Sequence, residues 1–256
     1  MVANPVRQTD AITAGIVNLA GVEGCRHGYK PDCQQCEIRT IAICSVFGAA
    51  EISEVQKLAT TVELGPGEVL FEQGDPATYV YNLVSGRLRL FTLLTDGRRQ
   101  ITNFARPGEF LGFAADDMRH SSAEAITQVS ACRFVKSDLA QLSERHPKIC
   151  KRILQLKERE LETTQGQLVA VGRKSPVERV ASFLCSELEA SGWQNSQKPV
   201  IELQMTRGDI ADYLGLTIET VSRTFTKLRQ TGTISLPRAE RVMVEDLERL
   251  RDFQES

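Results

Sequence analysis

Residues 138–173 read DLAQLSERHPKICKRILQLKERELETTQGQLVAVGR and join a strand-rich front half of the chain to a helical back half. This nearly loop-free run predicts mainly one long helix, with Pro147 separating a short lead-in turn from it. Leu154, Leu161 and Leu168 recur every seven residues. The apolar residues that widen this stripe are Ile153, Leu156, Val169 and Val171. A narrow stripe favours packing on a partner helix, so 138–173 is a candidate dimerisation helix. A core helix of a single domain is the alternative, because three heptads are few for a coiled coil.

Length and composition bound the class of protein. The chain has 256 residues, 41% of them hydrophobic and 25% charged, which is enough for two soluble domains. The net charge of -2 says nothing about partners. The charge-free stretch Ala11–Val22 is too short to span a bilayer and lacks signal-peptide flanks, so we expect a cytoplasmic protein without a membrane segment. Cysteines in that compartment are typically ligands, redox centres or small buried residues.

Four of the seven cysteines lie close together, in the run CRHGYKPDCQQC (25–36) and at Cys44. The two residues between Cys33 and Cys36 let both thiolates reach one metal or cluster from a tight turn. Residues 1–50 therefore form a predicted cysteine-rich ligand-binding segment. Spacing alone accepts zinc or an iron–sulfur cluster and slightly favours zinc, while unliganded thiols are the third reading. His27 is interpreted as a solvated loop residue.

Residues 51–137 have the pattern of a strand domain. After a short predicted helix over 52–59, apolar and polar residues alternate in short runs with turn signals about every 8–12 residues, which is typical of an all-β roll or sandwich. Asp96-Gly97 between two such runs predicts a hairpin. Cys132, taken alone, reads as a buried strand cysteine. No convergent acid–base or nucleophile pattern favours an enzyme built on this domain.

The most specific motif in the predicted C-terminal domain (174–256) is MTRGDIADYLGLTIETVSRTFTKL, residues 205–228. Ser175-Pro176 marks the first helix of this domain, in which Cys185 is interpreted as packing, like Cys150 before it. Thr206 and Asp209 form a capping box, Gly215 takes a turn, and Thr217 caps a second helix. This is a helix-turn-helix, followed by a predicted β-hairpin wing over 233–244.

The second helix of the motif presents candidate DNA-reading residues. Its N-terminal half carries Glu219, Ser222 and Arg223, the end that meets base edges in a major groove. Arg223 can pair with guanine and Glu219 with the cytosine opposite, so the two could read one G·C pair. The other predicted DNA contacts are Arg207, Thr217, Thr220 and Lys227. The alternatives are a favourable charge at a helix N-terminus for Glu219 and a solvated side chain for Arg223.

These features together resemble the CRP/FNR family of bacterial transcription regulators over nearly the whole chain. The implied fold class is α+β: an N-terminal double-stranded β-roll of the cyclic-nucleotide-binding type, a long dimerisation helix and a C-terminal winged helix-turn-helix. TRGDI (206–210), YLGLT (213–217) and ETVSR (219–223) look like the recognition element of the oxygen-sensing FNR branch. With Ile218 in place of the extra base-reading arginine of the cyclic-AMP receptor branch, the implied half-site is TTGAT.

The resemblance also implies a cofactor. FNR proteins bind a [4Fe–4S] cluster through three N-terminal cysteines and one in the roll, which match Cys33, Cys36, Cys44 and Cys132; this reverses the preference for zinc. Cys25 resembles an upstream cysteine that is not a ligand. The spacing between Cys36 and Cys44 is longer than in the enteric FNR proteins. It resembles the FnrN and FixK-like regulators, some of which retain the cluster while others lack the cysteines.

The implied function is an oxygen-responsive regulator, mainly an activator of anaerobic genes, that binds palindromic double-stranded DNA as a homodimer and acts on RNA polymerase. A FixK-like or zinc-stabilised regulator without cluster control is the alternative. Cyclic nucleotide binding is disfavoured. The segment GEFLG (108–112) resembles the nucleotide-binding segment, but the following MRHSSA (118–123) has serine where a phosphate-binding arginine belongs.

Overall fold

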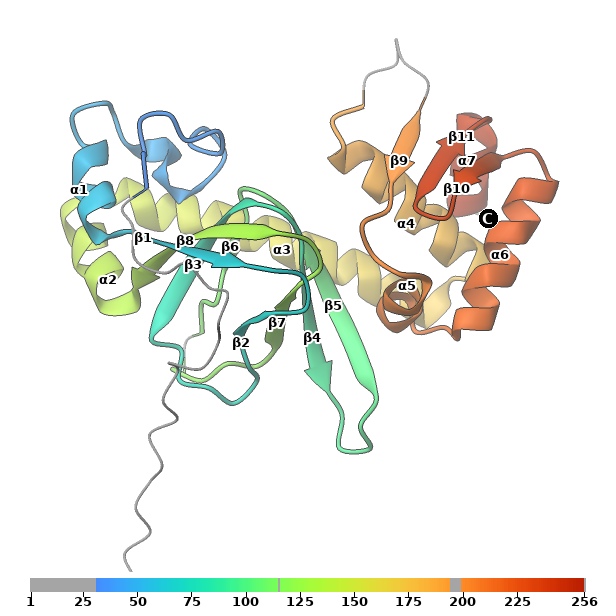
Figure 1. Cartoon of the computed structure of the whole chain (residues 1–256), viewed down its shortest axis with the longest axis horizontal. Coiled ribbons are helices and arrows are strands. Elements are labelled where there is room, and N and C mark those ends of the chain that lie inside the picture. The colour runs from blue at the N-terminus through green and yellow to red at the C-terminus, as the bar shows by residue number, and fades with distance from the viewer. Residues whose placement is uncertain (1–30, 115, 194–198, 256) are drawn as a thin grey trace, which may run out of the picture.

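The computed structural model of the chain describes residues 31–114, 116–193 and 199–255 (Figure 1). A β-rich domain and a mainly helical domain lie side by side, and helix α3 (Lys148–Arg173) runs along the first and into the second. This order confirms the predicted α+β architecture. Within the described ranges, no helix is long and apolar enough to cross a membrane.

The front domain is a roll of two four-stranded antiparallel sheets, ordered β1-β8-β3-β6 and β2-β7-β4-β5. The strands are β1 (Thr60–Leu64), β2 (Val69–Phe71), β3 (Tyr79–Ser85), β4 (Leu88–Leu93), β5 (Arg99–Ala105), β6 (Phe110–Leu111), β7 (Ser122–Ala125) and β8 (Val129–Val135). Apolar residues of both sheets, such as Leu83 and Leu88, face each other in the core. The predicted hairpin is confirmed: Leu93 pairs with Arg99, and Gly97 takes a φ of 84° that suits glycine.

The helices around the roll partly correct the prediction. Helix α1 (Ile52–Leu58) is confirmed. The expected lead-in turn is instead a complete helix, α2 (Lys136–Arg145). The break follows from Pro147, which excludes its predecessor from helical geometry, so His146 has φ -128° and ψ 77°.

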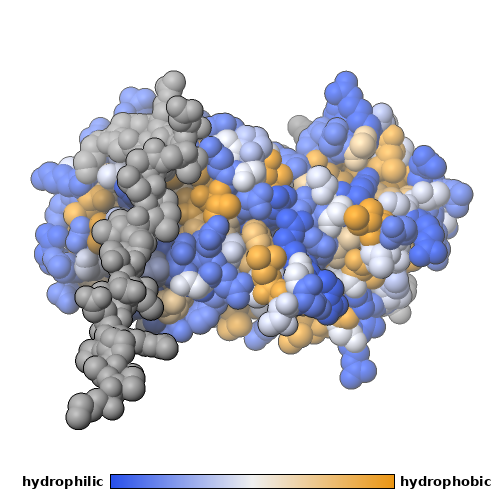
Figure 2. Space-filling model, turned by 60° about the horizontal axis from the view of Figure 1, so that its bottom comes forward, coloured by the Kyte–Doolittle hydropathy of each residue, from blue (hydrophilic) through white to orange (hydrophobic). Residues whose placement is uncertain are grey.

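Part of the apolar stripe of α3 is exposed, and part of it packs against the roll. Leu154, Leu161 and Leu168 are 69%, 57% and 73% exposed, so the reading of α3 as an ordinary core helix is wrong. Ile153 and Leu156 instead pack against the core beneath the cysteine segment. Figure 2 shows hydrophobic residues as several separate patches in a mostly hydrophilic surface.

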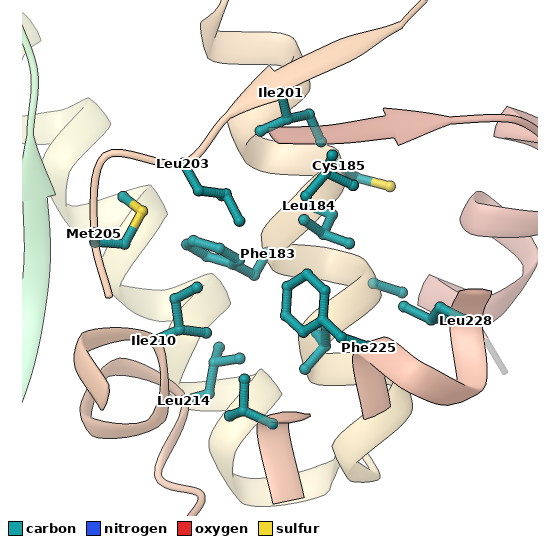
Figure 3. Close-up of a cluster of buried hydrophobic side chains, with 14 of the residues drawn as sticks. Phe183, Leu184, Cys185, Ile201, Leu203, Met205, Ile210, Leu214, Phe225 and Leu228 are labelled. Atoms are coloured by element: carbon teal, nitrogen blue, oxygen red, sulfur yellow. The ribbon is translucent and has the colours of Figure 1, made fainter. Parts of the chain in front are cut away.

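The C-terminal domain packs helices against a small sheet ordered β10-β11-β9. Its elements are α4 (Pro176–Ala190), β9 (Val200–Glu202), α5 (Arg207–Leu214), α6 (Ile218–Gln230), β10 (Ile234–Arg238), β11 (Arg241–Val244) and α7 (Leu247–Glu255). Ser175 caps α4 in a capping box with Glu178. Phe183, Ile210 and Phe225 converge in the core from α4, α5 and α6 (Figure 3).

The two predictions for packing cysteines have different outcomes. Cys185 lies in the core of the C-terminal domain, as predicted (Figure 3). The prediction for Cys150 is wrong, because its side chain is exposed near the start of α3. The turn of α3 that carries Cys150 buries the neighbouring Ile149 instead.

Candidate DNA-binding and cysteine sites

Local hydrogen bonds build the helix-turn-helix as the sequence predicts. The Asp209 backbone N–H donates to the Thr206 hydroxyl at 3.1 Å, and the Asp209 carboxylate accepts from the Thr206 backbone N–H at 3.1 Å. Gly215 ends α5 with a φ of 62°, a conformation that favours glycine. The Thr217 hydroxyl accepts from the Thr220 backbone N–H at 3.2 Å and so starts α6.

The predicted reading face of α6 is exposed in the part of the chain that the structure describes. Glu219, Ser222, Arg223 and Lys227 are all exposed. A hydrogen bond from its own backbone N–H, then one from Thr217, holds the pKa of the Glu219 carboxyl below its usual range. Glu219 is therefore an ionised acceptor at neutral pH, as pairing with a cytosine amine requires.

Arg207 lies apart from this face. Its guanidinium carbon stands 3.4 Å from the centre of the Phe225 ring, and Nη2 donates to the Ala239 carbonyl in the wing turn at 3.3 Å. Burial lowers the pKa of Arg207 to about 10. The side chain thus ties α5 to α6 and the wing. Its predicted DNA contact stays a prediction that requires the side chain to leave Phe225.

The second candidate site is formed by thiols that are far apart in the sequence. Cys33, Cys36 and Cys44 come from the N-terminal segment and Cys132 from the middle of β8, where it lies opposite Thr61 and Asn82. All four are free thiols, and Cys33, Cys44 and Cys132 are buried in one core cluster.

The thiols of this cluster have raised pKa values. Burial, and to a lesser extent charge repulsion from Cys33, Cys36 and Cys44, raise the pKa of Cys132 to about 12. Burial likewise raises the pKa of Cys44 to about 11. Cys25 lies outside the described residues.

The predicted four-cysteine centre remains a prediction that rests on the chemistry of its donor atoms. Four thiolates suit either zinc or a [4Fe–4S] cluster. In the described part of the chain, no three His, Cys, Asp or Glu side chains are arranged to hold one metal ion. Each cysteine of a four-iron cluster binds a different iron. The four sulfur atoms therefore lie farther apart around a cluster than around a single metal ion.

The pocket between the roll and α3 has an arginine, but its guanidinium is already engaged. A cavity of about 190 Å³ is lined by Gly112, Arg119, Ser121 and Lys157 among others. Arg119 donates to the Gly112 and Tyr79 carbonyls and stacks on Phe71 at 4.3 Å. Lys157 is paired with Glu160 at 2.6 Å. Because Arg119 and Lys157 already bond to protein groups, we still predict that cyclic nucleotides do not bind in this pocket.

Sequence reasoning missed the contact between the domains. Asp209 of α5 is 2% exposed and accepts from Arg89 at 3.1 Å and Arg99 at 2.8 Å, both from the roll. Glu187 of α4 likewise accepts from Arg87 at 2.7 Å and Arg106 at 2.8 Å. These partners lie far apart in the chain, so no local spacing signals them.

A β-roll, a long helix with an exposed leucine seam and a winged helix-turn-helix define a DNA-binding transcription regulator. Residues 61–146 match the cyclic nucleotide-binding domain and residues 178–253 the Crp-like helix-turn-helix domain. The nitrogen fixation regulation protein FixK of Bradyrhizobium diazoefficiens is 44% identical over 204 residues, 80% of this chain and 86% of that protein. The transcriptional activator protein anr of Pseudomonas aeruginosa is 31% identical over 222 residues, 84% and 90% of the two chains.

A solved structure agrees with these relatives. FixK2 from Bradyrhizobium japonicum matches with a TM-score of 0.70 and 32% identity over 76% of this chain and 96% of that chain. The chain belongs to the CRP/FNR family and is FixK-like. It is a DNA-binding transcription regulator and not an enzyme.

Proposed function

We propose that this protein is an oxygen-responsive regulator, mainly an activator, in which Cys33, Cys36, Cys44 and Cys132 hold a [4Fe–4S] cluster. The observation that carries the proposal is the convergence of these thiols from the N-terminal segment and β8 into one core. When bound, the cluster would supply an oxygen-labile link between the segment and the roll.

The chain's own residues would complete the response. Leu154, Leu161 and Leu168 leave an exposed seam on α3 that a second copy would cover. Such a homodimer would present two copies of α6 about one DNA turn apart, as a TTGAT palindrome requires. RNA polymerase is the expected protein partner, and the cytoplasm is the expected location.

One experiment tests the cluster directly. Iron, acid-labile sulfide and the visible spectrum are measured on protein purified without oxygen and then exposed to air. About four irons and four sulfides per chain, with absorbance that bleaches in air, are expected. Binding of a TTGAT palindrome should fall in parallel.

A second candidate function is a FixK-like regulator without cluster control, which the similarity to FixK of Bradyrhizobium diazoefficiens and to the FixK2 structure favours. Such a protein would bind the palindrome equally with and without air. Colourless protein that holds zinc, or no metal, and still binds the palindrome would support this second candidate and contradict the first.

A further inference from the structure

Helix α3 presents two separate faces in its first turns. Ile149, Arg152, Ile153 and Leu156 recur at helical spacing and form the face toward the cysteine segment. Ile149 is completely buried in the same core cluster as Cys33, Cys44 and Cys132. Leu154 starts the exposed seam on another side of the same turns. Any rotation of α3 against the cysteine segment therefore also moves the seam.

Arg152 makes the polar contact on the first of these faces. Its Nε donates to the Ala42 carbonyl at 3.2 Å, and its Nη2 donates to the Ile41 carbonyl. These carbonyls immediately precede the 3-10 helix η2 (Ile43–Val46), which carries Cys44. A planar guanidinium that bonds two consecutive carbonyls fixes their direction as well as their distance.

The backbone on the cysteine side is also fixed. Ala42 and Ile43 are almost completely buried, and Cys44 is 7% exposed. The Ala42 carbonyl additionally accepts from the Ser45 backbone N–H at 3.2 Å, which closes the turn of η2. The two carbonyls that Arg152 bonds therefore directly precede the same buried turn that carries Cys44.

We propose that Arg152 is the positioning residue that couples ligand binding at the cysteine site to the dimer seam of α3, an inference that rests on the proposed function. With Cys44 and Cys132 held together, the Ile41 and Ala42 carbonyls are fixed and Arg152 holds α3 against the segment. With these cysteines released, the carbonyls move, Arg152 loses its partners, and Leu154 and Leu161 leave the orientation that a partner helix needs.

The test uses the full chain with three substitutions: Arg152→Ala, Arg152→Lys, and Arg159→Ala as a matched control. Arg159 lies on the same helix with an exposed side chain. Iron content, and the dimer dissociation constant from sedimentation, are measured for cluster-loaded and cluster-free protein. Hydrogen exchange of the amides of residues 38–47 is followed in the cluster-free protein.

For the wild type and Arg159→Ala we expect cluster loading to tighten dimerisation, within the range of about 5- to 150-fold that couplings between sites show. Arg152→Ala should keep its iron, but its dimer dissociation constants with and without the cluster should differ by no more than about twofold. The amides of residues 38–47 should exchange faster in this variant. Arg152→Lys, which can donate from one nitrogen only, should fall between.

An undiminished gain in Arg152→Ala that retains iron, or unchanged exchange of residues 38–47, would overturn the proposal while leaving the proposed function intact. If Arg152→Ala loses its iron but Arg152→Lys keeps it, the lysine variant becomes the test. A full gain in dimer affinity on cluster loading of Arg152→Lys would then also overturn the proposal. Wild-type protein without iron, or without any gain on loading, would instead show that the proposed function itself has failed.

Discussion

Arg99 and Asp209, 110 residues apart, join the two domains: Arg99 Nη2 donates to Asp209 Oδ1 at 2.8 Å, and Asp209 is 2% exposed. The same carboxylate closes the capping box of α5 with Thr206. One buried side chain therefore starts the first helix of the DNA-binding motif and fixes that helix to the β-roll.

Asp209→Asn should destabilise the C-terminal domain. The amide oxygen of the asparagine can still accept from Thr206, but the substitution removes the negative charge that Arg89 and Arg99 face. The free energy of unfolding should fall by about 1.5–3 kcal/mol, the contribution of hydrogen bonds to a charged group. Asp212→Asn is the control: its carboxylate is 35% exposed, so about 0–1 kcal/mol is expected. Trp193, the single tryptophan, packs against this domain's core and reports urea unfolding. Equal midpoints for the two variants would contradict this prediction.

Leu161→Glu should leave the fold intact and yield a monomer. Leu161 is 57% exposed in the single chain, so its loss costs the protomer little, while a charge on the seam opposes pairing. Sedimentation velocity gives the oligomeric state. Leu93→Glu, at a residue 54% exposed beside the β4–β5 turn, is the matched control and should remain dimeric. If Leu161→Glu dimerises with wild-type affinity, α3 is not the dimer interface.

Arg223→Ala and Glu219→Ala should each relax sequence preference at one G·C pair of the half-site. The expected cost is about 1–3 kcal/mol on the preferred sequence and less on a sequence changed at that pair. Binding to a set of single-base variants of the palindrome measures this. Lys227→Ala, an exposed cation on the same helix, should weaken binding evenly across the set. An unaltered preference in both variants would refute the assignment.

Arg207→Ala should lower stability rather than change base preference. The guanidinium that stacks on Phe225 and bonds the Ala239 carbonyl is lost, at a cost of about 0.5–2 kcal/mol for the stacking. Thermal unfolding measures the loss, and Arg207→Lys shows how much the planar group contributes. If Arg207→Ala is instead as stable as the wild type, and the slope of log DNA affinity against log salt concentration falls by about one, Arg207 contacts a phosphate.

Cys185 should contribute to loss of stability at alkaline pH. Burial raises the pKa of its thiol from 9.0 to about 11 in the folded chain. Between these values the unfolded chain has lost the proton that the folded chain retains, so stability falls as pH rises from about 9 to about 11. Cys185→Ala should make this fall shallower, and Cys150→Ala, at an exposed thiol, should not. Identical slopes for wild type and Cys185→Ala between these pH values would contradict the prediction.

Several features of this fold depend only on neighbouring residues. Thr206, Asp209, Gly215 and Thr217 define the helix-turn-helix because caps and left-handed turns act within a few residues. Asp96-Gly97 likewise defines its hairpin, and the seven-residue repeat of leucines marks an exposed seam on α3. Pro147 predicts the break after His146, but the full extent of helix α2 before it depends on the packing of Leu139 and Leu142 against the roll, which local spacing does not show.

The contacts between distant segments depend on the tertiary fold. The tertiary fold brings Cys132 into one core cluster with Cys33 and Cys44, packs Cys36 against that cluster, and sets Arg152 on the Ile41 and Ala42 carbonyls and Arg99 on Asp209. It also assigned Arg207 to Phe225 instead of leaving it beside the reading face of α6. Such pairings follow from the way the sheets and helices close on one another, which spacing along the chain does not encode.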